Sequence, residues 1–92
     1  MNNGEILSPG DIVTSTAGRD RGRYYIIMAI DRGFARICDG DLHKTDNMKK
    51  KNVKHIKASG KYCEYVRGKL LCGDKVTNAE LRRSISEFEE KL

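Results

Sequence analysis

Three arginines at alternate positions give the first indication of chemistry in this sequence. Arg19, Arg21 and Arg23 stand within the glycine-containing segment 17–23. The guanidinium group is planar, it suits phosphate oxygens, and it also stacks on exposed bases. Because alternate residues of an extended chain point to the same side, we expect the three side chains to line one edge. The competing interpretation is a solvated turn in which Asp20 neutralises part of the charge.

A second cationic segment follows at residues 44–57, where six lysines stand against a single acid, Asp46. Close positive charges repel one another, and a polyanion relieves this repulsion as it releases its own counterions. The segment is the strongest indication of a binding surface in the sequence, and a solubilising loop is the alternative. The six lysines are Lys44, Lys49, Lys50, Lys51, Lys54 and Lys57.

Two further side chains adjoin these cations and can contact a nucleic acid. Tyr24 follows Arg23 directly, and an aromatic ring at this position can stack on an unpaired base. His55 stands among lysines and can stack on a base or bond a phosphate, as can His43. An ordinary surface position is the simpler interpretation of each histidine. We expect most of the other aromatic residues to lie in the core.

The sequence gives little support to catalysis or to metal binding. It contains no legible set of serine, cysteine, histidine and carboxylate for nucleophilic catalysis, no P-loop and no dinucleotide-binding fingerprint. Its three cysteines and two histidines lack the CxxC or HxxxH spacing of zinc sites. We therefore expect no enzymatic activity, no cofactor and no metal. Cys38 and Cys72 are interpreted as small core residues of a reduced protein.

Length and net charge narrow the class of protein further. A chain of 92 residues makes one small domain, which buries roughly 60–65% of its unfolded surface and leaves no room for a deep active site. The net charge of +5 favours a polyanionic partner. No apolar run approaches the roughly 18 residues of a membrane span, and residues 1–5 lack the features of a secretory signal. We expect a cytoplasmic protein that does not associate with membranes.

Short apolar runs separated by glycine turns predict the strands that must position the cations. We expect strands that begin at Ile12, that cover residues 24–30 and 34–38, and that cover residues 52–57. The run 24–30 is apolar throughout, which predicts a central strand covered on both faces over part of its length. Which face of 34–38 points inward is ambiguous, and 42–52 is expected to be a polar loop. This spacing is typical of a small, bent antiparallel barrel.

The last third of the chain has a different pattern. Residues 58–76 do not decide between strand and helix. Thr77 and Glu80 have the spacing of a helical capping box, and the residues that follow place four apolar side chains on one face. This pattern predicts an amphipathic helix over about 78–91, which either packs on its own domain or docks on a partner. The four apolar residues are Leu81, Ile85, Phe88 and Leu92.

The segment from Pro9 to Lys57 resembles a KOW domain, the SH3-like barrel of several large-subunit ribosomal proteins and transcription elongation factors. The matching features are the opening Gly-Asp-Ile-Val at 10–13, the turn at 17–23 with Gly22 as the motif glycine, and the apolar strand that follows. Later segments, Asp-Gly-Asp-Leu-His-Lys and Val-Lys-His-Ile, are similar to those of small stand-alone KOW proteins. The resemblance implies a cytoplasmic RNA-binding or ribosome-associated role and carries no function onto the tail.

We therefore expect a mainly β fold with three parts. A lead-in covers residues 1–8, a small SH3-like antiparallel barrel covers 9–58, and an extension with the amphipathic helix covers 59–92. The expected function is non-catalytic binding of RNA, in particular ribosomal RNA, through the arginines and lysines above together with Tyr24 and His55. The alternative is a protein-interaction module of the transcription or translation machinery that uses the barrel surface and the C-terminal helix. Positive charge alone does not exclude DNA.

Overall fold

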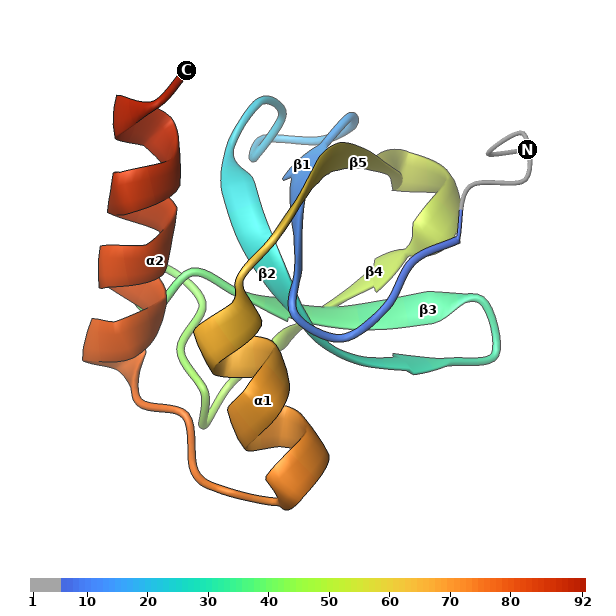
Figure 1. Cartoon of the computed structure of the whole chain (residues 1–92). Coiled ribbons are helices and arrows are strands. Elements are labelled where there is room, and N and C mark those ends of the chain that lie inside the picture. The colour runs from blue at the N-terminus through green and yellow to red at the C-terminus, as the bar shows by residue number, and fades with distance from the viewer. Residues whose placement is uncertain (1–5) are drawn as a thin grey trace.

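Five antiparallel strands form one sheet, and two helices pack on one of its faces (Figure 1). The computed structural model describes residues 6–92, so the predicted lead-in lies for the most part outside the described residues. The spatial order of the strands is β4-β3-β2-β1-β5. The elements are β1 (Asp11–Ser15), β2 (Tyr24–Asp31), β3 (Phe34–Cys38), β4 (Lys49–Asn52), the 3₁₀ helix η1 (Val53–His55), β5 (Ile56–Tyr62), α1 (Glu64–Cys72) and α2 (Asn78–Glu90). The predicted mainly β fold with a C-terminal helix is confirmed.

The central strand of the sheet is β2, and both of its faces are buried over part of its length, as its apolar sequence predicts. Ile26 and Met28 enter a hydrophobic cluster beneath the helices. Tyr25 and Ile27 enter a second cluster on the opposite face, to which neither α1 nor α2 contributes a buried residue. Because side chains alternate between the faces of a strand, two buried faces require an uninterrupted apolar run.

The structure resolves the ambiguity of β3. Ala35 and Ile37 are fully buried in the second cluster. Phe34 and Arg36 therefore point to the other face, and both are exposed. This face is the one that the helices cover elsewhere, where Cys38 lies in the first cluster. The turn between β2 and β3 extends away from both helices (Figure 1), which leaves Phe34 and Arg36 uncovered.

Two predictions about residues 42–57 are wrong. The segment 49–52 is not loop but the edge strand β4, in which Lys50 is paired with Arg36 of β3. Lysine has little intrinsic preference for strands, but it is common on sheet edges, and the ladder to β3 overrides the local preference. The predicted strand over 52–57 is divided, because the side chain of Asn52 caps η1 by accepting from Lys54 N–H at 2.9 Å. The next strand, β5, begins at Ile56 and runs past residue 58, where the sequence placed a domain boundary.

The C-terminal part packs on the sheet. Thr77 and Glu80 form the predicted capping box at the start of α2. Leu81 and Ile85 are buried beside β2, so the helix packs on its own domain. The fourth predicted apolar residue of α2, Leu92, lies beyond the end of the helix and is 75% exposed.

The undecided segment 58–76 contains the end of β5 and the short helix α1. Cys38 is buried as predicted, whereas the prediction that Cys72 lies in the core is wrong, because it ends α1 on the exposed side. Neither α1 nor α2 has the length and hydrophobicity that a helix needs to cross a membrane.

The two edge strands are β4 and β5, and within residues 6–92 no ladder joins them, so the sheet is not closed. The 3₁₀ helix η1 connects the two edges. The N–H of Val53 donates to the Gly33 carbonyl at 3.0 Å, and the N–H of Thr16 donates to the His55 carbonyl at 2.9 Å. These bonds hold η1 beside both the β2–β3 turn and the end of β1.

Candidate nucleic-acid interface

The turn between β1 and β2 is organised by a buried acid, Asp20. Its carboxylate accepts hydrogen bonds from Ser15 Oγ at 3.0 Å and from Lys51 Nζ at 3.1 Å. Lys49 Nζ lies 3.9 Å from its second oxygen. Burial raises the pKa of this carboxyl, but the hydrogen bonds from Lys51 and Ser15 outweigh burial, so the pKa lies below its usual value. The ammonium of Lys51 therefore forms an internal ion pair with Asp20, which connects β4 to the β1–β2 turn.

The loop between β3 and β4 is organised in the same way by Asp39. One carboxylate oxygen accepts from the backbone N–H groups of Asp41 and His43 at 3.0 and 2.9 Å. The other accepts from Arg23 at 3.2 Å. Burial raises the pKa of Asp39, but these backbone hydrogen bonds and Arg23 lower it further, so the group is held ionised. Arg23 is thus directed toward an internal acid.

The three arginines do not share an edge in the way their spacing predicts. The backbone over residues 17–22 forms turns instead of the extended chain on which that prediction rested. Arg23 pairs with Asp39, while Arg19 and Arg21 are exposed and form no ion pair among the described residues. Internal acids therefore engage three of the predicted binding cations, which are Arg23, Lys49 and Lys51.

A cationic surface lies on β3 and β4, where the sequence interpretation identified only part of it. Arg36 and Lys50 are directly opposite each other in the ladder between these strands. Phe34 lies two residues before Arg36 on the same face, and Lys50 Nζ is 4.7 Å from the centroid of its ring. Together with Arg32 of the adjoining turn, these residues line a depression of about 220 Å³, in which Asp31 is the one acidic residue among the described lining residues. We call Arg32, Phe34, Arg36 and Lys50 the Phe34 face.

Arg32 and Arg36 were not among the predicted site residues. A signal for Arg36 was present, because a strand with Ala35 and Ile37 inward must turn Arg36 outward. The sequence alone did not decide that orientation, since Phe34 and Cys38 offered an equally apolar alternative. No such signal is present in the sequence for Arg32. In the structure this residue has a positive φ of 49°, which is uncommon for a residue other than glycine.

The remaining predicted site residues lie in two places. Lys54 and His55 of η1 and Lys57 of β5 are exposed. The backbone hydrogen bonds of η1 hold Lys54 and His55 next to the β2–β3 turn, which adjoins the Phe34 face, and next to the end of β1, which leads into the Arg19–Arg21 turn. Lys57 lies on β5, where it is paired with Thr14 of β1. Lys44 lies elsewhere, in a loop whose next residue bonds to the start of α2 through Thr45 N–H and Asn78.

Tyr24, the predicted stacking residue, packs against the helix. Its ring contacts that of Phe88 edge to face, with 5.0 Å between the centroids. The contact belongs to the hydrophobic cluster beneath α1 and α2. The structure therefore does not bring Tyr24 together with the exposed cations of the Phe34 face.

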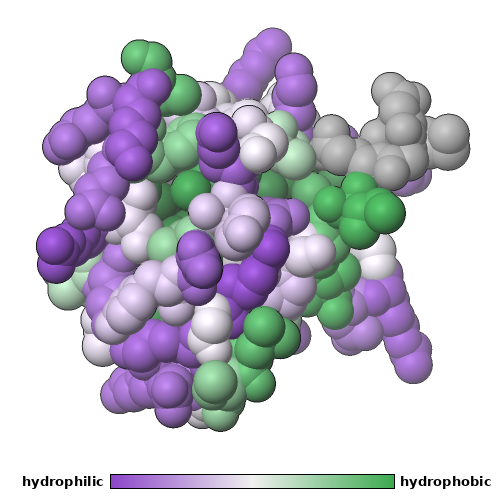
Figure 2. Space-filling model, in the orientation of Figure 1, coloured by the Kyte–Doolittle hydropathy of each residue, from purple (hydrophilic) through white to green (hydrophobic). Residues whose placement is uncertain are grey.

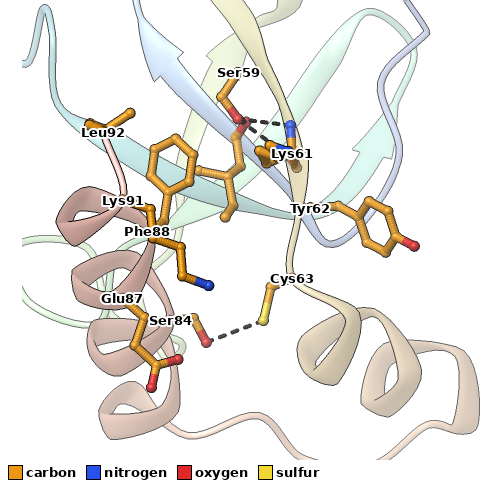
Figure 3. A pocket seen from close by; sticks show the side chains of 10 residues that line it. Ser59, Lys61, Tyr62, Cys63, Ser84, Glu87, Phe88, Lys91 and Leu92 are labelled. Carbon is orange, nitrogen blue, oxygen red and sulfur yellow. Dashed lines mark hydrogen bonds between the residues drawn. The ribbon is translucent and has the colours of Figure 1, made fainter.

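A second hollow lies between β5 and α2, with a volume of about 390 Å³ (Figure 3). Phe88 and Ile12 supply apolar lining, and the thiol of Cys63 donates to Ser84 Oγ at 3.2 Å across it. Lys61, Lys91 and Glu87 also line the hollow. Among residues 6–92, no three histidine, cysteine, aspartate or glutamate side chains come together as a metal ion would require.

The face of the molecule seen in Figure 2 carries mainly hydrophilic residues. Figure 2 shows hydrophobic residues there in separate groups surrounded by polar and charged ones. A partner of this side would thus meet polar and charged groups over most of its contact area.

Comparison with known proteins identifies no relative: no protein-family model matches the chain, and no curated protein matches it significantly. The resemblance to KOW domains therefore remains a hypothesis based on the residues quoted for it. The assignment of a function rests on the geometry of the cationic surface.

Proposed function

We propose that this protein is a non-catalytic RNA-binding module with an SH3-like barrel fold, which binds RNA phosphates through the Phe34 face and through Lys54 and His55 of the adjoining η1. The observation that carries the proposal is the pairing of Arg36 with Lys50. Like charges directly opposite each other destabilise a sheet, and neither side chain has an ion-pair partner among the described residues. A bound polyanion relieves this repulsion.

The helices support RNA over duplex DNA as the partner. Readers of the DNA major groove usually insert a helix or a two-stranded ribbon that presents side chains to base edges. Here α1 and α2 both bury residues against the sheet, and the C-terminal half of α2 carries Glu87, Glu89 and Glu90. A cationic sheet surface beside short loops suits the irregular backbone and unpaired bases of structured RNA. The resemblance to KOW domains favours ribosomal RNA and a cytoplasmic, ribosome-associated role.

The test is a salt series of binding to ribosomal RNA and to duplex DNA of equal length. We expect the natural protein to prefer RNA and its affinity to fall steeply with salt. The variant R36A/K50A should lower the slope of log K against log salt by about 1.5, because each lost phosphate contact removes 0.7–0.9. The matched control is K61A/K91A, which removes two lysines from the hollow between β5 and α2.

The control is expected to bind as the natural protein does. Equal salt slopes for the natural protein and R36A/K50A would refute the assignment of this surface. A slope near zero for the natural protein would refute RNA binding altogether.

A second candidate function is protein interaction at the hollow between β5 and α2. The observation that favours it is that β5 is an edge strand beside this partly apolar hollow, an arrangement that can accept an extended peptide as an added strand. Deletion of α2 is not a valid test, because α2 buries Leu81 and Ile85. Ser84→Trp instead fills the hollow, and it should abolish binding of a peptide partner and leave RNA binding intact.

A further inference from the structure

We propose that Phe34 is a stacking platform for one unpaired base, with the cations around it holding the neighbouring phosphates. This inference rests on the proposed RNA-binding function and adds the feature of the RNA that the site recognises. Phe34 is 38% exposed as a residue and belongs to neither hydrophobic cluster. It lines a depression together with Arg32, Arg36 and Lys50. Aromatic rings among arginines and lysines are the usual elements of single-strand recognition.

Three aromatic rings in the described part of the chain carry a cation over them, and comparison of the three singles out Phe34. Arg67 lies over Tyr62 at 3.9 Å, but its guanidinium also bonds Asp11 and the Pro9 carbonyl. That guanidinium is thus fixed over Tyr62 by contacts inside the protein.

The third ring, that of Tyr65, and the cation over it are also held by contacts within the protein. Lys69 lies over Tyr65 at 5.2 Å and pairs with Glu80 at 2.9 Å. The hydroxyl of Tyr65 donates to the same carboxylate. Tyr65 and Lys69 of α1 therefore both contribute to the contact with α2 through Glu80.

Lys50 differs from both of these cations. It lies over Phe34 and has no acidic partner among residues 6–92. An exposed cation–π contact is worth only about 0.5–1 kcal/mol, so the ammonium can leave the ring at little cost. A base that stacks on Phe34 takes the place of Lys50, and the ammonium moves to the phosphate of the same nucleotide. The positive charge freed from the ring is thereby used in binding.

The dimensions of the depression agree with this occupant. The depression has a volume of about 220 Å³ and lies where the β2–β3 turn meets β3 and β4. At about 30 Å³ for each molecule of liquid water, this volume equals roughly seven water molecules, so it has room for one planar ring system. A base-paired nucleotide cannot present the face of its base in this way, because its faces are covered by neighbours in the stack. The site therefore selects loops, bulges and single-stranded ends over continuous helix.

The test compares Phe34→Leu and Phe34→Trp on two RNAs of equal length, one a continuous duplex and one a hairpin with a loop of unpaired adenines. Phe34→Leu keeps an apolar side chain and removes the aromatic face. We expect it to bind the hairpin roughly tenfold more weakly, which corresponds to the lower part of the range for one stacked base. Binding to the duplex should change by less than about twofold, and Phe34→Trp should restore hairpin binding.

A fluorescent analogue, 2-aminopurine, placed in the loop reports stacking independently of affinity. Its emission should be quenched by the natural protein and by Phe34→Trp at saturation, and not by Phe34→Leu. Tyr62→Leu is the matched control, since it removes another exposed aromatic ring that lies under a cation. This control should quench as the natural protein does.

The outcomes separate the inference from the proposed function. Loss of hairpin affinity in R36A/K50A together with natural affinity and quenching in Phe34→Leu would overturn the stacking platform and leave phosphate binding in place. Absence of salt-dependent RNA binding in the natural protein would overturn both. Equal weakening on duplex and hairpin in Phe34→Leu would also overturn the platform, because stacking on an unpaired base requires the difference between the two RNAs.

Discussion

Lys51 of β4 donates a hydrogen bond to Asp20 of the β1–β2 turn at 3.1 Å, and the two residues are 31 positions apart in the chain. Both side chains are close to 10% exposed. The same ammonium donates to the Ala17 carbonyl at 2.9 Å. A lysine from the most cationic run of the sequence thus serves as an internal connection between two segments of the fold.

Removal of the Asp20 charge is expected to destabilise the domain. Asp20→Asn leaves Lys51 with its charge largely buried and unpaired, and breaking such a pair costs about 3 kcal/mol. The free energy of unfolding from urea denaturation measures the effect. Glu89→Gln is the control for removal of an exposed acid and should stay within about 0.5 kcal/mol of the natural protein. Equal stability of Asp20→Asn and the control would show that the pair contributes nothing.

Neighbouring lysines of β4 are expected to differ in their effects. Lys50→Ala removes an exposed cation opposite Arg36, so RNA affinity should fall while stability stays the same or rises slightly. Lys51→Ala removes the partner of Asp20, so stability should fall, and the affinity of the remaining folded protein should change little. Denaturation curves and RNA titrations on both variants check this separation. Similar loss of affinity in both would argue for an unstructured lysine loop.

Stability is expected to fall in acid partly because of Glu80. The hydrogen bond from Tyr65, the backbone N–H of Thr77 and the ammonium of Lys69 lower the pKa of this carboxyl from 4.5 to about 2. A folded-state pKa below the unfolded value stabilises the fold above about pH 4.5, and the contribution is lost as the pH falls toward 2. Glu80→Gln should therefore reduce the difference in unfolding free energy between pH 7 and pH 3. Glu90→Gln, on the same helix, should leave that difference unchanged.

Gly40 is expected to tolerate no side chain. Its φ is +78°, and a Cβ at this position would lie 2.2 Å from the carbonyl oxygen of Asn78 in the first turn of α2. Gly22 also has a positive φ, of +87°, but no atom lies within 4 Å of its Cβ position. Gly22→Ala should cost about 1 kcal/mol from backbone strain alone. Gly40→Ala should cost clearly more in thermal denaturation, and equal costs would contradict the close approach.

Local sequence pattern determines much of this fold. The apolar run of β2 required burial on both faces, and the capping box with its apolar face determined α2. These features depend on residues a few positions apart, so the sequence alone expresses them. The same holds for the glycines of the β1–β2 turn. By contrast, β4 is a strand because it pairs with β3, and its lysines alone indicated a loop.

The candidate surface needed the tertiary structure. The sequence places much of the positive charge in segments that reach this end of the sheet, but it does not show which cations are available. Lys50 and Lys51 are identical and adjacent, and they point to opposite faces of one strand, where one meets Phe34 and the other meets Asp20. Asp20 is far from them in the chain, so no local pattern records the pairing. Composition thus determined the charge of the protein, and strand pairing decided where that charge faces solvent.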